Sequence, residues 1–256
     1  MPVIVRTHES VDLSAGAGLR QITVDPREVA VASLPSWRLI ASAGDKLISP
    51  SGAIANRASA DGAMTPYTTG RIWSVVTVPD SPSPMFDTGT AEATAIRYRP
   101  NVVANNTEWS VALAMRWPLG ASATTIIQPE PSISDSRAGV RIALATANAE
   151  GKAALAIRRG DATAQISTGA NVWADQTIVG VFSRGPSGSR IRINGVQMAF
   201  SSTTVVPLDV TGFTIAPDFK GWIGDVCLYD RDLGAADQAA ARGAIETWLM
   251  AKHGLI

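Results

Sequence analysis

The sequence predicts an antiparallel β-sandwich of two sheets that closes with one amphipathic C-terminal helix. Two observations lead to this prediction. From residue 108 onward, short runs in which apolar residues alternate with polar or small ones follow one another, with turn residues between them. A single segment with helical spacing then ends the chain. Many short strands at such intervals are typical of a sandwich.

The strand predictions rest on apolar residues at every second position. In "EWSVALAMRW", Trp109, Val111, Leu113, Met115 and Trp117 fall on one face. Asn194-Gly195 accepts the positive φ angles of a type I′ turn and therefore predicts a tight hairpin. Further strands are predicted in "GVRIALATA", "AALAIRRG", "QTIVGVFSRG", "SRIRINGVQM", "VTGFTIAP" and "WIGDVCLY".

The region before these strands, residues 36–107, is rich in proline and turns. Its clearest predicted strand is "RIWSVVTVP" (Arg71–Pro79). The stretch that follows, "PDSPSPMFD" (Pro79–Asp87), is predicted to be an exposed loop.

The closing helix is predicted at about residues 235–252. Asp237 lies in its first turn, where a carboxylate opposes the positive helix end. Gly254 follows as a natural C-terminal cap. A lone helix cannot bury its apolar stripe by itself, so it is expected to lie on a sheet or across the sandwich edge. The stripe consists of Ala241, Ile245, Trp248 and Leu249.

Residues 1–35 are predicted to form an N-terminal arm or docking segment, and residues 36–256 the sandwich domain. The arm has β-like runs around Val3–Val5 and Val29–Val31, broken by "SAGAG", Pro26 and Pro35. Two interpretations stay open: the arm docks on another chain, or it supplies edge strands of the same domain.

Composition excludes several classes of partner. Lys and Arg together number 22, as do Asp and Glu, and no basic stripe is present. This balance argues against nucleic acid as a ligand and against a polybasic membrane patch. Cys227 is the only cysteine, so no intrachain disulfide is expected. No signal peptide or membrane-spanning segment is expected, which predicts synthesis in a cytoplasm and release by lysis or a dedicated export machine.

Four segments carry a resemblance to a known superfamily: "NTEWSVALAMRW", "NVWADQTIVGVFSRGPSGSRIRINGV", "GWIGDVCLYDRDL" and the helix end "AKHGL". Together they resemble the laminin-G-like, concanavalin A-like lectin/glucanase superfamily, most of all its bacterial and phage branch. The resemblance covers about Ser36 to the C-terminus and leaves residues 1–35 outside. It implies an all-β jelly-roll sandwich of two antiparallel sheets.

The catalytic pattern of glucanases on this fold is missing. The resemblance would imply acidic residues at alternate positions of one strand, one as nucleophile and one as general acid. "EPSISD" (Glu130–Asp135) has the wrong spacing. Asp230 and Arg231 are expected to be structural. His8 and His253 lie near opposite ends, so no Ser-His-Asp pattern is recognisable. No zinc, calcium or nucleotide motif is present either. We therefore predict no catalytic residues, no metal, no cofactor and no enzyme activity.

Sugar binding remains as a candidate function. Sugars dock on exposed aromatic faces with polar neighbours, so exposed Trp and Tyr side chains are the candidates for such a site. Trp109, Trp173, Trp222 and Trp248 are assigned to the core. The candidates for an exposed platform lie near turns, although each also fits a packing role; they are Trp37, Trp73, Trp117, Tyr67 and Tyr98.

The expected function is that of a non-enzymatic structural protein of a phage or phage-like virion: a head decoration, spike, fibre or tail component. Its lectin-like domain is expected to bind host surface polysaccharide. Expected partners are other virion proteins and copies of itself, for example in a trimer. The alternative is an extracellular bacterial carbohydrate-binding module, and a glycoside hydrolase is the third hypothesis.

Overall fold

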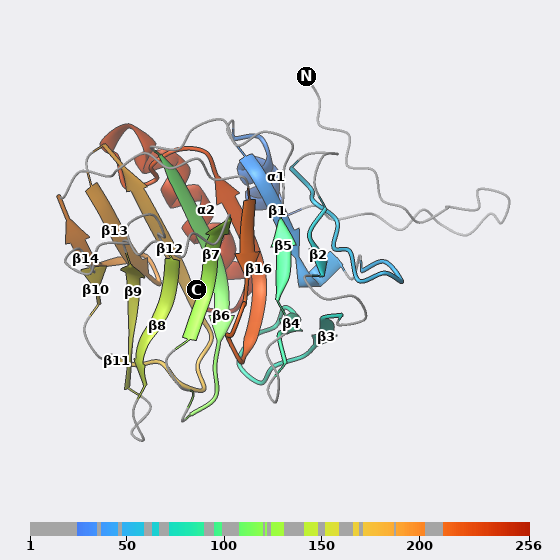
Figure 1. Ribbon diagram of the computed structural model, residues 1–256. Coiled ribbons are helices and arrows are strands. Elements are labelled where there is room, and N and C mark those ends of the chain that lie inside the picture. The colour runs from blue at the N-terminus through green and yellow to red at the C-terminus, as the bar shows by residue number, and fades with distance from the viewer. Residues whose placement is uncertain are drawn as a thin grey trace, which may run out of the picture.

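Two antiparallel sheets lie face to face in a computed structural model of the chain (Figure 1). The structure describes residues 25–34, 37–45, 48–58, 63–66, 72–89, 95–98, 108–119, 121, 124–130, 141–147, 152–158, 166–168, 171–186, 188–202 and 212–256. The predicted jelly-roll sandwich with a C-terminal helix is confirmed.

The first sheet has eight strands within the described ranges, in the order β14-β13-β12-β6-β16-β4-β3, and β1 also pairs with β16. All of these pairings are antiparallel. The strands are β1 (Trp37–Ser42), β3 (Ser74–Val76), β4 (Met85–Asp87), β6 (Trp109–Arg116), β12 (Ile178–Gly185), β13 (Gly188–Ile193), β14 (Val196–Ser201) and β16 (Trp222–Tyr229).

The second sheet also has eight described strands, in the order β10-β9-β8-β7-β15-β5-β2, and β11 also pairs with β9. The strands are β2 (Thr65–Pro66), β5 (Ile96–Tyr98), β7 (Thr124–Glu130), β8 (Arg141–Ala147), β9 (Lys152–Arg158), β10 (Ile166–Ser167), β11 (Asn171–Val172) and β15 (Gly212–Ile215).

The main core lies between the two sheets. Val111, Leu113 and Met115 point into it from β6, as their alternation predicts. Phe213 and Ile215 of β15 reach it from the opposite sheet. The predicted hairpin is confirmed between β13 and β14, where Asn194 and Gly195 both have positive φ angles (48° and 78°).

A second core lies on the outer face of the first sheet, under α2 (Ala239–Lys252). A short 3₁₀ turn, η2 (Ala236–Gln238), leads into the helix. Ile245, Trp248 and Leu249 are buried there against Ala112, Ala114 and other outward-facing residues of the sheet. The helix therefore covers the sheet, which confirms the prediction for its apolar stripe. All eight residues of β6 are buried because both faces of the strand are covered.

The described part of the predicted arm forms a helix, α1 (Pro26–Ala32), so the strand expected around Val29–Val31 is wrong. The side chain of Asp25 accepts a hydrogen bond from the Arg27 backbone, and Pro26 occupies the first turn. This pair starts a helix more strongly than the valines favour a strand. Val31 is buried beside α2, so this segment packs on its own domain; residues 1–24 lie outside the described residues.

The loop expected at Pro79–Asp87 is only partly exposed. Ser81 and Ser83 are buried, and Met85–Asp87 form β4. A short 3₁₀ turn, η1 (Ala43–Asp45), lies close to β4 and β16. Within the described ranges, no helix is long and apolar enough to cross a membrane.

Candidate functional site

The outer face of the first sheet carries one row of polar and aromatic residues beyond its apolar centre. Trp222 of β16 pairs with Arg116 of β6 on one side and with Asp87 of β4 on the other. Ser74 of β3 pairs with Asp87 and extends the row. Side chains alternate along a strand, and the neighbouring Ile223 points into the inner core, so this row faces outward. We call Arg116, Trp222, Asp87 and Ser74 the Trp222 row.

Arg116 lies beside the Trp222 ring, and two carboxylates lie beside Arg116. The Arg116 guanidinium lies 5.9 Å from the ring centroid. It forms an ion pair with Asp80 and lies 3.9 Å from a carboxylate oxygen of Asp175. Trp222 itself is partly buried, whereas Asp80 and Asp175 expose 37% and 55% of their side chains. The row therefore presents an aromatic ring next to accessible carboxylates.

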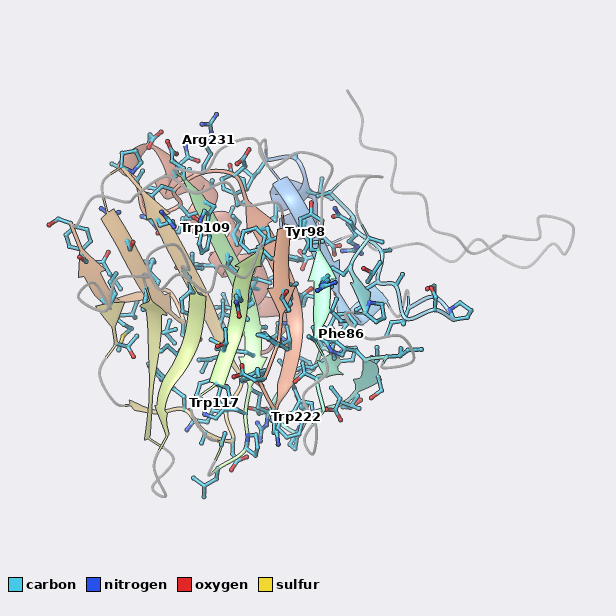
Figure 2. All side chains as sticks on the ribbon, viewed as in Figure 1. Phe86, Tyr98, Trp109, Trp117, Trp222 and Arg231 are labelled. Atoms are coloured by element: carbon cyan, nitrogen blue, oxygen red, sulfur yellow. The ribbon has the colours of Figure 1, made fainter. Side chains whose placement is uncertain are left out.

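Asp175 is held by a turn that requires an unusual backbone. Its φ angle is 58°, a conformation that Asp and Asn tolerate better than most residues. Its backbone N–H donates to the Trp117 carbonyl (2.9 Å), and its carboxylate accepts from the Leu119 N–H (3.3 Å). These contacts fix the carboxylate at the end of the sandwich where Trp117 and Trp222 lie (Figure 2).

Asp80 reaches the row from the loop between β3 and β4. It accepts hydrogen bonds from the Thr177 hydroxyl (2.8 Å) and the Thr177 backbone. Partial burial would raise the pKa of this carboxyl, but the bonds from Thr177 and the charge of Arg116 together lower it. Asp80 therefore stays ionised at neutral pH. The same loop, Thr77–Pro82, lines a surface hollow of about 570 Å³.

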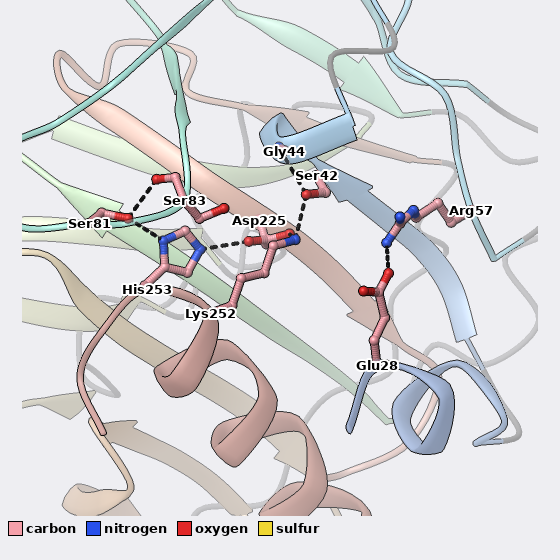
Figure 3. A network of polar contacts seen from close by, with 9 residues as sticks. All are labelled: Glu28, Ser42, Gly44, Arg57, Ser81, Ser83, Asp225, Lys252 and His253. Atoms are coloured by element: carbon pink, nitrogen blue, oxygen red, sulfur yellow. Dashed lines mark hydrogen bonds and ion pairs between the residues drawn. The ribbon is translucent and has the colours of Figure 1, made fainter. Parts of the chain in front are cut away.

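A buried polar network holds the Thr77–Pro82 loop against the end of α2 and β16 (Figure 3). The Ser81 hydroxyl lies 2.8 Å from Nδ1 of His253, whose Nε2 lies 2.6 Å from Oδ2 of Asp225. Lys252 donates to Oδ1 of Asp225 (2.7 Å) and to the Ser42 hydroxyl (2.6 Å). The end of α2, the strand β16 and the loop are thereby joined.

This chain of Ser81, His253 and Asp225 corrects the expectation that no such arrangement exists. The Ser83 carbonyl lies 2.6 Å from the Ser81 hydroxyl and competes with His253 for its single proton, whereas a catalytic serine gives that proton to the histidine. All three side chains are also buried. The network therefore fits a structural role.

The pKa shifts of the described carboxyl groups have one direction. Glycoside hydrolysis needs one carboxyl with a raised pKa. Where the structure displaces the pKa of a described carboxyl group, the direction is downward: this holds for Asp25, Asp80 and Asp225. Within the same ranges, no group of three or more His, Cys, Asp or Glu is placed to hold a metal ion.

The expected aromatic platform does not form from the residues predicted for it. Trp73, Trp117 and Tyr98 are each 1% exposed and belong to the inner core, so their expected exposure is wrong. These three residues are close to turns in the sequence, but a residue near a turn is buried when the turn folds back over the sandwich. Tyr67 and the side chain of Trp37 lie outside the described residues.

Sequence reasoning placed Trp222 in the core and missed the row around it. Trp109 and Trp248 are buried as predicted, and Trp173 is partly buried against the inner core. A signal for the row exists in the sequence: Arg116 follows Ala112 and Ala114 on the outward-facing positions of β6, and β4 ends with Asp87. Charged residues at the ends of two neighbouring strands indicate where the covered part of the outer sheet face ends.

Comparison with known proteins supports the fold. No protein-family model and no curated protein matches the chain. Among solved structures, it is similar to domain 4 of AbnA, a GH43 extracellular arabinanase from Geobacillus stearothermophilus, in complex with arabinotriose. That similarity has a TM-score of 0.58 and 17% identity over 82% of this chain and 98% of that domain.

Two further structures show the same similarity. The binding domain of botulinum neurotoxin DC in complex with SialylT has a TM-score of 0.57 and 12% identity over 82% of this chain. Trypanosoma rangeli sialidase has a TM-score of 0.58 and 12% identity over 88% of this chain. The chain spans 51% of the toxin domain and 37% of the sialidase. At such identities the similarity shows the fold alone, a jelly-roll sandwich.

Proposed function

We propose that the protein is a non-enzymatic, lectin-like carbohydrate-binding module in which a sugar docks on the Trp222 row. The observation that carries the proposal is the partly buried Trp222 ring, flanked by Arg116 and Asp87 on the same sheet face that α2 covers in part. No other described part of that face combines an aromatic ring with accessible carboxylates.

The chemistry of the row suits a sugar. The C–H face of a pyranose or furanose ring packs on an aromatic ring, while its hydroxyl groups need polar partners close by. The carboxylates of Asp80, Asp87 and Asp175 accept hydrogen bonds from hydroxyl groups, and bonds to a charged acceptor are stronger than neutral ones. Arg116 is held in place by its ion pairs, so the site is organised before a ligand arrives.

The solved structures similar to this chain support the same proposal. The arabinanase domain was determined with arabinotriose and the toxin domain with SialylT. Because one fold serves many functions, this support is by analogy and the site itself must be tested. The lowered carboxyl pKa values and the burial of Ser81 and His253 support a binding role without catalysis.

We further propose that the module is an outward-facing component of a phage or phage-like virion. It would be made in the host cytoplasm and would assemble with other virion proteins and with further copies of itself. The support is the phage-like form of "GWIGDVCLYDRDL" and the balanced charge of the chain. A bacterial carbohydrate-binding module acting outside the cell would use the same row but would not need self-assembly.

The sugar proposal is tested on a glycan array with the full chain and two variants. Trp222→Ala should abolish the signal, because it removes the stacking surface. Phe200→Ala is the matched control: Phe200 is 50% exposed, stands beneath Arg190 in a similar cation–aromatic pair and lies on β14, away from the row. An array without signal, or equal binding by Trp222→Ala, would refute the proposed function.

The assembly proposal is tested by the mass of the protein in solution. The full chain is compared with a chain that begins at Asp25, since α1 packs on the domain and should be kept. A symmetric oligomer of the full chain supports a virion component. A monomer in both cases favours the stand-alone carbohydrate-binding module.

A further inference from the structure

We infer that the Trp222 row selects neutral or amino sugars and rejects anionic ones such as sialic acids and uronates. The inference rests on the proposed function and adds the chemical class of the ligand. It is argued from the charges that face the Trp222 ring, because any sugar stacked on that ring must lie among them.

The described charges around the ring do not cancel. Asp80, Asp87 and Asp175 contribute three negative charges, and Arg116 contributes one positive charge, which leaves two negative charges. In the turn before β16, Asp218 accepts from the Thr125 N–H of β7 in the second sheet, and the balance stays negative even when the exposed Lys220 is counted.

The single cation is also poorly placed to receive a ligand carboxylate. Arg116 exposes only 10% of its side chain, and its guanidinium is already engaged by Asp80 and lies near Asp175. An anionic sugar would have to displace one of these carboxylates, whereas the hydroxyl groups of a neutral sugar can donate to them. The ammonium group of an amino sugar would gain an ion pair with one of these carboxylates.

The size of the discrimination follows from Coulomb's law. In water, one charge about 6 Å from another changes binding by about threefold, so two uncompensated carboxylates should weaken an anionic ligand by about tenfold. The discrimination should shrink at about 1 M salt, where the screening length falls to about 3 Å.

The test titrates the full chain with matched pairs: the best neutral glycan from the array and its sialylated or uronate counterpart, together with lactose and sialyllactose. We expect the neutral member to bind about tenfold more tightly and the difference to fall at high salt.

The double variant Asp87→Asn, Asp175→Asn removes two charges and keeps the local structure. The Asn oxygen can still accept from the Gly89 N–H at position 87 and from the Leu119 N–H at position 175, and Asn tolerates the positive φ there. It should lower the ratio of neutral to sialylated affinity about tenfold, to near one, while the neutral member itself binds more weakly because its hydroxyl groups lose two charged acceptors. Asp237→Asn, on an exposed turn, is the control and should change neither affinity.

Each outcome has a defined meaning. If the wild-type chain binds the sialylated member as tightly as the neutral one, or if the double variant leaves the ratio of the two affinities unchanged, the inference is wrong and the proposed function stands. If no glycan of either class binds, the proposed function fails and the inference fails with it.

Discussion

Nε2 of His253 lies 2.6 Å from Oδ2 of Asp225, and neither residue is exposed to solvent. The Lys252 ammonium group donates a hydrogen bond to the other carboxylate oxygen of Asp225. The contact joins the last turn of α2 to the middle of β16, and through Ser81 it reaches the loop that carries Asp80. A buried ion network at the end of a helix thus holds the loop beside the Trp222 row.

Replacing Asp225 with alanine should destabilise the protein by about 3–5 kcal/mol, because it leaves the Lys252 ammonium without its buried counter-charge and the His253 ring without its hydrogen-bond partner. Denaturant unfolding measures the loss. Asp237→Ala removes an exposed carboxylate and should stay within about 0.5 kcal/mol of wild type. A loss below about 1 kcal/mol for Asp225→Ala would mean that the network contributes little to stability.

Acid should weaken the fold through the same carboxyl. Burial alone would raise its pKa, but the charge of Lys252 and the hydrogen bond from His253 outweigh burial and lower the pKa of Asp225 from 3.8 to about 2. The folded pKa is below the unfolded one, so this stability is present above pH 3.8 and is lost as the pH falls toward about 2.

The loss amounts to about 2 kcal/mol over that interval. Unfolding free energies from pH 6 to pH 2 check this, with Asp225→Asn as the comparison. The difference between wild type and variant should shrink as the pH falls below 3.8. A constant difference would contradict the account.

Leu249→Ala should cost about 2–4 kcal/mol, because Leu249 is fully buried under the outer face of the first sheet. Thr247→Ala lies on the exposed side of the same helix and should change stability by less than about 0.5 kcal/mol. Thermal and chemical unfolding measure both variants. Equal effects would show that α2 does not bury its apolar stripe on the sheet.

Two glycines should respond in opposite directions to alanine. A Cβ on Gly224 of β16 would lie 2.3 Å from the His253 ring, so Gly224→Ala must displace the end of α2 and should destabilise by about 1–3 kcal/mol. A Cβ on Gly243 of α2 would meet nothing within 4 Å. Gly243→Ala should therefore stabilise the helix by about 0.5–1 kcal/mol. Unfolding midpoints separate the two, and destabilisation by Gly243→Ala would be unexpected.

The sandwich was predictable because its signals are local. The alternation in β6 predicts which side chains face inward, and Asn194-Gly195 predicts a hairpin. The spacing of Trp248 and Leu249 predicts a helix whose apolar side must pack on a sheet. The helix α1 was missed because its valines favour a strand, while the Asp25-Pro26 start signal outweighs them.

The candidate site was not predictable from local pattern. Its residues come from positions 80, 87, 116, 175 and 222, which only the pairing of β16 with β6 and β4 and the folding back of two loops bring together. The Ser81–His253 contact spans 172 residues in the same way. Exposure of Trp73 and Trp117 was likewise decided by tertiary packing.

The structure of the protein with the strongest glycan from the array bound to it tests the central claim most directly. We predict a sugar ring packed on Trp222, with hydroxyl groups bonded to Asp80 or Asp87. A sugar bound elsewhere, for example on the outer face of the second sheet, would contradict the assignment of the Trp222 row.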